Sequence, residues 1–318
     1  EQVKIVKFEN AGVMKLDALG LDDDQVEKLK SLREKSSGIF ITSGPPKSGT
    51  STTFYAMMNN HDPFMNDINT LEREVTATLD NVTQHTYSMN DSSASSYAEK
   101  LQSMIRMGPS IIGAADCDDA EAAKLATTAA AKQNRLVHVN IEATSAIKAL
   151  GKWIKFTGDK DMVIDSLLGL SNQRLARKLC RECRQSYKPN PKLLKKFNIP
   201  PKNIKVFYRP GEIEYDKHGK PIVCEKCQGT GYYGRIGIFE TVVVDDELRK
   251  NLKQAKTMKD IALCFSKAKV INIQQRAIKK VIDGTTSINE VIKELSNKDS
   301  KKSKAKAKAA SKPKASGN

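Results

Sequence analysis

The stretch GIFITSGPPKSGTSTTFYA, from Gly38 to Ala56, decides the fold of this chain. A short β-rich run, Ile39–Thr42, leads into a glycine-containing loop, and Thr52–Met58 then has the composition of a helix. This is the layout of a phosphate-binding loop, G-x-x-x-x-G-K-[ST], in which backbone amides surround phosphate oxygens between a strand and a helix. The stretch therefore predicts an α/β protein built around a nucleotide-binding loop.

The loop keeps the spacing of this motif but not its lysine. Gly44 and Gly49 have the required separation, and Ser51 fills the Ser/Thr position. The lysine position holds Thr50, which carries no charge to place against the β- and γ-phosphates. Whether ATP and Mg²⁺ bind here is open at this point. The predicted nucleotide-binding residues are Gly44, Lys47, Ser48, Gly49, Thr50, Ser51 and Thr52.

Downstream of the loop, strand-like runs alternate with helical segments. The predicted strands are Ile68–Leu71, Ile111–Ala115 and Leu136–Ile141. Three helices are predicted: one through Tyr97–Ile105, one that begins after Asp118 or Asp119, and one from Ser145 to Phe156. Such alternation is typical of a largely parallel sheet covered on both faces. At 318 residues, the chain is long enough for two domains.

Charge and the ends of the chain bear on location. The net charge is +16, and residues 298–318 contribute eight lysines and one aspartate in a low-complexity segment that we expect to be disordered. No run of 18 apolar residues and no signal peptide are visible, so we expect a cytoplasmic protein. The chain begins with Glu1, on the strand-like alternation Val3–Val6, and we expect an upstream part that is missing.

The side chains that could hold a metal concentrate in two cysteine pairs, Cys180-x-x-Cys183 and Cys224-x-x-Cys227. Two such pairs supply four thiolates for a tetrahedral Zn²⁺, and a site closed by four thiolates is structural rather than catalytic. Buried free thiols and a redox pair are the alternatives. We expect the other two cysteines to be core thiols: Cys117 and Cys264. We expect core or surface roles for the scattered histidines: His61, His85, His138 and His218.

The order of these elements strongly resembles the secretion ATPase family of type II secretion and type IV pilus assembly. The most specific parts are QRL at Gln173–Leu175, CREC at Cys180–Cys183 and GYYGRIG at Gly231–Gly237. The similarity extends from Glu1 to about Ser296. It implies the following organisation: the end of an N-terminal domain and a linker (1–36), a RecA-like P-loop core (37–172), a zinc-binding tetracysteine module (173–240), a C-terminal helical subdomain (241–296) and a disordered lysine-rich tail (297–318).

Members of this family hydrolyse ATP as hexameric rings, and the resemblance assigns their motifs to positions of this chain. Within the loop, Pro46 and Lys47 replace residues that favour the phosphate cradle, since proline has no N–H to donate. The catalytic positions retain acidic residues at Glu72, in the Asp-box, and at Asp116, where the Walker B motif has glutamate. The other motif positions carry altered residues: Arg73 and Thr76 for acids, Asp118 for arginine, and Arg135 and Glu142 for the two histidines.

Three functions are consistent with these residues. The first is a structural or regulatory pseudo-ATPase subunit of a secretion or pilus assembly machine. It would work in a homo- or hetero-oligomeric ring, with contact to an inner-membrane platform. The second is an active motor in which Lys47 replaces the lysine and Asp116 the glutamate. The third is a nucleic-acid-binding protein that uses the basic tail, which we disfavour because no aromatic stacking set accompanies it.

Overall fold

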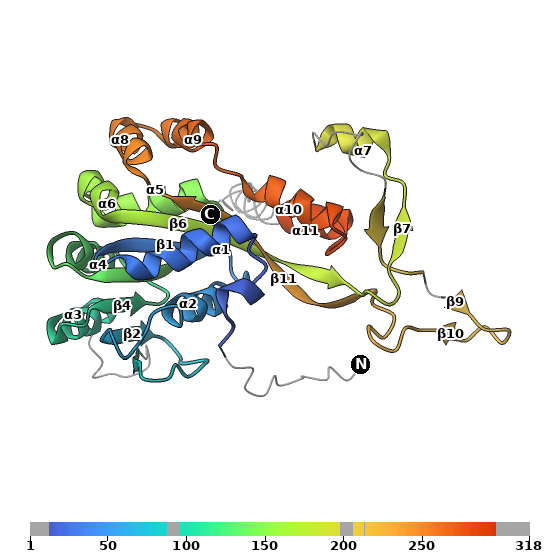
Figure 1. The fold of residues 1–318 in the computed structure, drawn as a ribbon, viewed down its shortest axis with the longest axis horizontal. Coiled ribbons are helices and arrows are strands. Elements are labelled where there is room, and N and C mark those ends of the chain that lie inside the picture. Colours follow the sequence, from blue (N-terminus) through green and yellow to red (C-terminus); the bar gives the residue numbers. More distant parts are fainter. Residues whose placement is uncertain (1–12, 88–95, 198–205, 213, 297–318) are drawn as a thin grey trace, which may run out of the picture. The chain divides into compact units, whose positions relative to one another are not determined.

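The structure is a computed structural model that describes residues 13–87, 96–197, 206–212 and 214–296. The chain divides into two compact units (Figure 1). The sheet unit holds residues up to Gln173 together with Phe239–Ile271, and the cysteine unit holds Arg174–Ile238 together with the residues from Asn272 onward. The predicted first strand and the lysine-rich tail lie outside the described residues.

A seven-stranded sheet forms the centre of the sheet unit. In spatial order its strands are β11 (Tyr232–Val243), β6 (Leu167–Leu179), β1 (Gly38–Gly44), β5 (Leu136–Glu142), β4 (Ile111–Ala114), β2 (Ile68–Glu72) and β3 (Thr83–Thr86). Each described pairing from β6 to β3 is parallel. The predicted α/β fold with a mostly parallel sheet is therefore confirmed.

Helices cover both faces of this sheet, as successive residues of β1 demonstrate. Ile39 and Ile41 belong to one buried apolar cluster, whereas Phe40 belongs to a second. Side chains alternate between the faces of a strand, so the two clusters lie on opposite faces. The helices of the sheet unit are α1 (Asp23–Lys30), α2 (Thr50–Met58), α3 (Tyr97–Met107), α4 (Ala120–Lys132), α5 (Ala146–Thr157), α6 (Lys160–Ser166), α8 (Asp246–Gln254) and α9 (Met258–Lys267), with 3₁₀ turns at Leu16–Ala18 and Ser31–Glu34.

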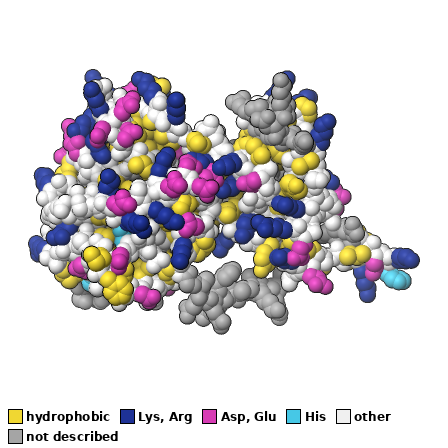
Figure 2. Space-filling view, in the orientation of Figure 1, with side chains coloured by type: hydrophobic (Ala, Val, Ile, Leu, Met, Phe, Trp, Pro, Cys, Tyr) yellow, Lys and Arg dark blue, Asp and Glu magenta, His cyan; other side chains and the backbone are white. Residues whose placement is uncertain are grey.

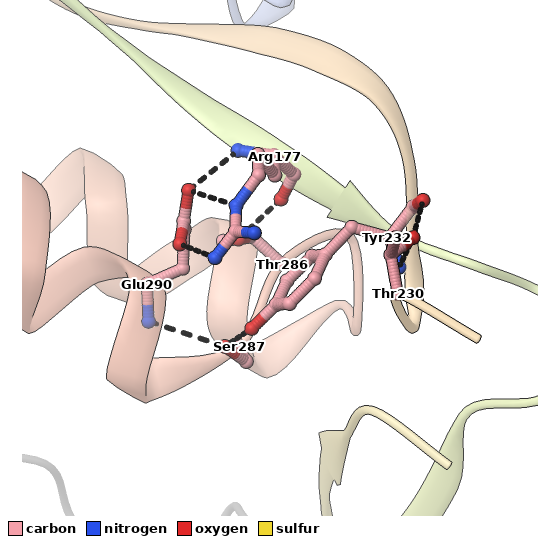
Figure 3. Close-up of polar contacts among 6 residues, drawn as sticks. All are labelled: Arg177, Thr230, Tyr232, Thr286, Ser287 and Glu290. Atoms are coloured by element: carbon pink, nitrogen blue, oxygen red, sulfur yellow. Dashed lines mark hydrogen bonds and ion pairs between the residues drawn. The ribbon is translucent and has the colours of Figure 1, made fainter. Parts of the chain in front are cut away.

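The cysteine unit consists of short hairpins and helices. Its elements are β7 (Gln185–Tyr187), α7 (Pro191–Lys196), β8 (Phe207–Arg209), β9 (Glu214–Tyr215), β10 (Pro221–Ile222), α10 (Ile273–Ile282) and α11 (Ile288–Ser296). Apolar side chains from β6, β8, α10 and α11 share one buried cluster, in which Phe207 and Val291 are fully covered. Beside it, Arg177 of β6 pairs with Glu290 of α11 (Figure 3).

The structure differs from the sequence expectation after residue 171. Residues 173–179 and 232–240 were assigned to the tetracysteine module, but they belong to the long strands β6 and β11, which also extend into the sheet unit. The predicted helical subdomain 241–296 is also divided, because α8 and α9 pack on the sheet unit and α10 and α11 belong to the cysteine unit.

No helix among the described residues is long and apolar enough to cross a membrane. On the face drawn in Figure 2, Lys and Arg side chains are interspersed with Asp and Glu side chains. Side chains of both signs therefore share this face. A nucleic-acid-binding protein usually gathers its positive charges in one patch or stripe instead.

Candidate functional site

The predicted strand–loop–helix is present at the carboxyl end of β1. The strand ends at Gly44, α2 begins at Thr50, and Gly49 caps the helix with a φ of +84°. Within the loop, the Ser48 N–H donates to the Pro45 carbonyl at 3.2 Å. Lys47 has a φ of +64°, in the left-handed region where a side chain costs roughly 1–2 kcal/mol. The loop thus keeps a conformation suited to glycine at position 47 while carrying lysine there.

Contacts on the inner side of the loop fix its shape. A Cβ atom at Gly44 would lie 2.1 Å from Ser48 Oγ, so only glycine fits at position 44. Gln173, on the neighbouring β6, donates from Nε2 to the Ser48 carbonyl oxygen at 2.9 Å. The QRL motif contains this glutamine, but the sequence did not indicate that it holds the loop.

Among the loop residues from Gly44 to Thr50, Lys47 is the only one with a charged side chain. Lys47 is exposed and makes no hydrogen bond or ion pair with the residues that the structure describes. Thr50 lies half-buried in the first turn of α2, and Ser51 beside it is exposed. A phosphate in the loop would therefore have the exposed Lys47 within the loop and an uncharged hydroxyl, that of Thr50, at the usual lysine position.

Glu72, the retained Asp-box residue, is buried at the end of β2. Its carboxylate accepts hydrogen bonds from the Tyr55 hydroxyl, from Thr70 Oγ1 at 2.6 Å and from Gln84 Nε2 at 3.1 Å. Burial and the hydrogen bond to Glu72 raise the pKa of Tyr55, so the phenol stays protonated as the donor. Three internal donors thus occupy the oxygens that would otherwise face water or Mg²⁺.

Asp116 follows β4 at the same edge of the sheet. Its φ is +51°, and its N–H donates to the Oδ1 atom of Asn140 on β5. Desolvation raises the pKa of Asp116, Arg73 opposes this rise, and the nearby Asp118 and Glu72 add to it. The structure therefore brings both predicted catalytic residues together with the altered charges at positions 73 and 118.

A lysine that the sequence did not single out lies at this edge. Lys152 of α5 forms an ion pair with Asp118 and donates to the Glu142 carbonyl oxygen at 3.0 Å. It joins two of the positions at which this chain differs from the family pattern. Nothing in its local sequence marked it, because the contact depends on how α5 packs on the sheet.

Of the two residues at the histidine-box positions, Glu142 lies at the loop edge and Arg135 does not. It directly precedes β5, whereas Glu142 ends that strand beside Gly44. A strand of this length spans roughly 20 Å. Within this chain, Arg135 therefore belongs to the opposite edge of the parallel sheet.

Two of the scattered histidines meet inside the sheet unit. The Nε2 atoms of His61 and His138 are 2.9 Å apart, and both side chains are buried. Burial lowers the pKa of His61 to about 4, and burial together with His61 lowers that of His138 well below its usual value. Both imidazoles are thus neutral at ordinary pH, with one donating to the other, and the predicted core role holds for them.

The four predicted metal ligands come together in the cysteine unit. Their Sγ atoms all lie within 4.8 Å of one another. Cys180 is 3.8 Å from Cys224, and Cys183 is 3.5 Å from Cys227. Thiolates around a tetrahedral Zn²⁺ with bonds of about 2.3 Å are about 3.8 Å apart, whereas a disulfide needs about 2.05 Å. The geometry fits four ligands of one ion.

The backbone around the second pair also fits a thiolate site. Gly231 N–H donates to Cys227 Sγ at 3.3 Å, and Gln228, Gly229 and Gly231 all have positive φ values. Without a metal, burial and the neighbouring thiols raise the pKa of Cys183 to about 12, so a cation is needed for the thiolate form. The remaining cysteines are buried in the sheet unit, as predicted: Cys117 and Cys264.

Known proteins share this sequence pattern over most of the chain. The profile of the family described as "Type II/IV secretion system protein" matches residues 1–293. The chain is 27% identical over 280 residues to "Type IV pilus assembly ATPase PilB" of Thermus thermophilus, covering 88% of the chain and 30% of that protein. It is 29% identical over 284 residues to "Type II secretion system protein E" of Dickeya dadantii, covering 89% of the chain and 54% of that protein. It thus spans about half or less of these relatives' length.

Solved structures share the fold. The crystal structure of "the Pilus Retraction Motor PilT and Bound ADP" matches with a TM-score of 0.61 and 17% identity, covering 89% of this chain and 67% of that chain. The Legionella pneumophila ATPase DotB matches with a TM-score of 0.61 and 14% identity, covering 88% and 64%. At these identities the likeness concerns the fold alone.

Proposed function

Because this chain belongs to the type II/IV secretion system protein family, we propose that it is a pseudo-ATPase subunit with a structural or regulatory role in a secretion or pilus assembly machine. The observation that carries the proposal is Thr50 at the first residue of α2, where a working phosphate-binding loop has lysine. Removing one preorganised electrostatic contact commonly lowers a rate by roughly 10²–10³.

Other features of the site support the same proposal. Pro46 has no N–H to offer a phosphate. The Glu72 carboxylate is buried and already accepts hydrogen bonds from Tyr55, Thr70 and Gln84. Several independent losses together would bring hydrolysis close to background. Ser51 and Asp116 are then remnants of a magnesium site.

An active motor is the competing function, and one observation favours it. Lys47 lies on the loop itself and is exposed, so its ammonium group is available to a bound phosphate. However, its backbone leaves the loop three residues before the usual lysine position. The active motor is therefore disfavoured by the position of Lys47 and by the three hydrogen bonds that the Glu72 carboxylate already accepts.

The tetracysteine cluster is proposed to bind one structural Zn²⁺. All four positions of a tetrahedral ion would be filled by Cys180, Cys183, Cys224 and Cys227, so no position remains for a substrate. The ion would join two segments of the cysteine unit that are 44 residues apart in sequence. The zinc therefore stabilises this unit and takes no part in hydrolysis.

The proposed setting is an assembly in the cytoplasm, peripheral at the inner membrane. The partners would be other subunits of a homo- or hetero-oligomeric ring and a membrane platform, as expected from the family. Nucleic acid binding through the basic tail is the least supported function, because no aromatic stacking set accompanies the tail in the sequence.

The test is direct measurement of nucleotide binding and turnover by the full chain. Isothermal titration calorimetry with Mg-ATP should show weak binding or none, and steady-state hydrolysis should stay below about 0.1 per second, which is slow against usual turnover numbers. Faster hydrolysis that is abolished by Lys47→Ala or Asp116→Ala would falsify the proposal and establish the active motor.

A further inference from the structure

A pocket next to the cysteine cluster gathers positive charge. It lies wholly within the cysteine unit and has a volume of about 380 Å³. We call it the basic pocket, after the four cationic residues that line it: Lys178, Arg181, Arg184 and Lys226. Asp283 is the only acidic residue among the described lining residues, so the lining carries a net charge of +3.

The two cysteine pairs place three of these cations. Arg181 lies between Cys180 and Cys183, and Arg184 directly follows that pair. Lys226 lies between the two cysteines of the second pair. The arrangement of thiols that would hold a metal thus also brings cations from two distant segments to one pocket.

Arg184 is held firmly at the wall. Its guanidinium stacks on the Tyr208 ring at 4.3 Å and donates to the Gly284 carbonyl at 2.6 Å. Gly284 has a φ of +72°, and a Cβ atom there would lie 2.6 Å from that ring, so only glycine permits this approach. The remaining N–H groups of Arg184 keep a fixed direction, which is the preorganisation that anion recognition requires.

Among the described residues, an acid near the pocket pairs with only one of its four cations. Lys178 and Arg181 have no hydrogen bond or ion pair with the residues that the structure describes. Lys226 pairs with the exposed Glu182 at 2.9 Å, and the Asp283 carboxylate accepts from the Thr285 N–H at 3.0 Å. The three cations that form no ion pair with a described residue (Lys178, Arg181 and Arg184) repel one another around this cavity, and a multiply charged anion would offset that repulsion.

We propose that the basic pocket binds a phosphate-bearing ligand through Lys178, Arg181 and Arg184. Guanidinium groups match phosphate oxygens in a two-pronged geometry, and lysine adds a point charge. The volume is that of a pocket for a small molecule. The exposed Tyr233 ring at the rim is available to an organic part of the ligand. The phosphate belongs either to a soluble polyphosphate compound or to a lipid headgroup.

This inference is independent of the proposed loss of ATP hydrolysis, because no lining residue belongs to the loop of the sheet unit. The simpler explanation is a group of solvated cations with no ligand. The two explanations predict different phosphate affinities when the same number of charges is removed from the pocket or from elsewhere on the cysteine unit. A specific site loses affinity only in the first case, whereas solvated cations lose it equally in both.

The experiment uses the full chain with three matched proteins. These are the wild type, a pocket variant (Lys178→Gln with Arg181→Gln) and a control variant (Lys188→Gln with Lys217→Gln). The control lysines are exposed in the same unit and outside the pocket. Both variants lose two positive charges and retain the tail, so non-specific attraction changes equally.

Binding of inorganic tripolyphosphate is measured by calorimetry at physiological salt, and vesicle flotation compares phosphatidylcholine with and without phosphatidic acid. We expect the pocket variant to lose about tenfold or more in affinity for one probe, and the control variant less than about threefold. The probe that shows this difference identifies the source of the phosphate. Unchanged zinc content and thermal unfolding confirm that the pocket variant is folded. Equal losses in both variants, or no binding of either probe by the wild type, would overturn the proposal.

Discussion

Arg177 holds the buried carboxylate of Glu290 with both prongs of its guanidinium group. Nε donates to Oε1 at 2.9 Å and Nη2 to Oε2 at 2.7 Å, while the Arg177 N–H also donates to Oε1 (Figure 3). The guanidinium stacks on Tyr232 at 4.0 Å. Burial alone would raise the pKa of Glu290, but the hydrogen bonds from Arg177 outweigh it and lower that pKa.

The first prediction concerns this pair. Arg177→Met should lower the free energy of unfolding of the cysteine unit by about 1–3 kcal/mol, because Glu290 is left buried without its partner. Urea unfolding at pH 7 measures the change. The control is Arg209→Met, which breaks an exposed pair with Glu212 and should cost less than about 1 kcal/mol. If both substitutions lower the free energy of unfolding by the same amount, the buried pair stabilises the protein no more than the exposed pair does.

The second prediction concerns strain in the loop. Lys47→Gly should raise the free energy of unfolding by roughly 0.5–1 kcal/mol. Glycine adopts the left-handed conformation without strain, and this gain exceeds the entropy that glycine loses on folding. The control, Lys35→Gly, removes an exposed lysine whose φ is −85°, and should destabilise by up to about 1 kcal/mol. If both substitutions destabilise equally, position 47 is not strained.

The loop, the alternation of strands and helices, and the cysteine pairs could be predicted because each depends on residues close in sequence. Gly44 and Gly49 define the loop by spacing alone, and a C-x-x-C pair positions both of its thiols locally. The strands β6 and β11 were not predicted, and QRL and GYYGRIG within them are not apolar runs. Pairing within a sheet, rather than local preference, makes these segments extended.

The site could be predicted only in part, because its other contacts join distant residues. Gln173 reaches Ser48 across 125 positions, and His61 reaches His138 across 77. No periodicity in the sequence encodes such pairs. The hydrogen bonding of Glu72 to three donors also depends on tertiary packing. Sequence comparison identified Glu72 as a retained acid, and only the structure showed that its oxygens are occupied.

The third prediction concerns the buried histidine pair. Above pH 6.5, the usual pKa of an unfolded histidine, both imidazoles are neutral whether the chain is folded or not. As the pH falls from there to about 4, the folded pKa of His61, the unfolded chain binds protons that the folded chain does not. The free energy of unfolding should therefore fall with pH in this window, by up to about 1.4 kcal/mol per unit for each histidine.

His61→Gln should reduce this pH dependence, because one titrating group is removed while an amide can still donate to His138. Chemical denaturation at intervals between pH 7 and pH 4 measures the slope. His218→Gln removes an exposed histidine and should leave the slope unchanged. An identical slope in the wild type and in His61→Gln would mean that the pair does not titrate as the structure indicates.

The fourth prediction is one Zn²⁺ per chain, held by the four thiolates. Metal analysis of the purified full chain should give one equivalent, and removal by a chelator should lower the melting temperature of the cysteine unit, because metal binding and folding are coupled. Cys180→Ser or Cys224→Ser should reduce the zinc content, whereas Cys264→Ala, in the sheet unit, should leave it unchanged. The absence of stoichiometric zinc from protein purified without chelators would eliminate the site.

The last prediction restores the missing charge. Thr50→Lys places an ammonium group at the first residue of α2, directly after the loop, where it can reach the β- and γ-phosphates. Mg-ATP affinity should rise about tenfold or more, as expected for one charge-assisted hydrogen bond. The control is Asn59→Lys, which adds the same charge beyond the other end of the helix and should change the affinity little. Turnover should stay near background in the revertant, because Tyr55, Thr70 and Gln84 still occupy the Glu72 carboxylate. Rapid hydrolysis by Thr50→Lys alone would show that the lysine was the only defect, and that the Asp-box is still able to act on water.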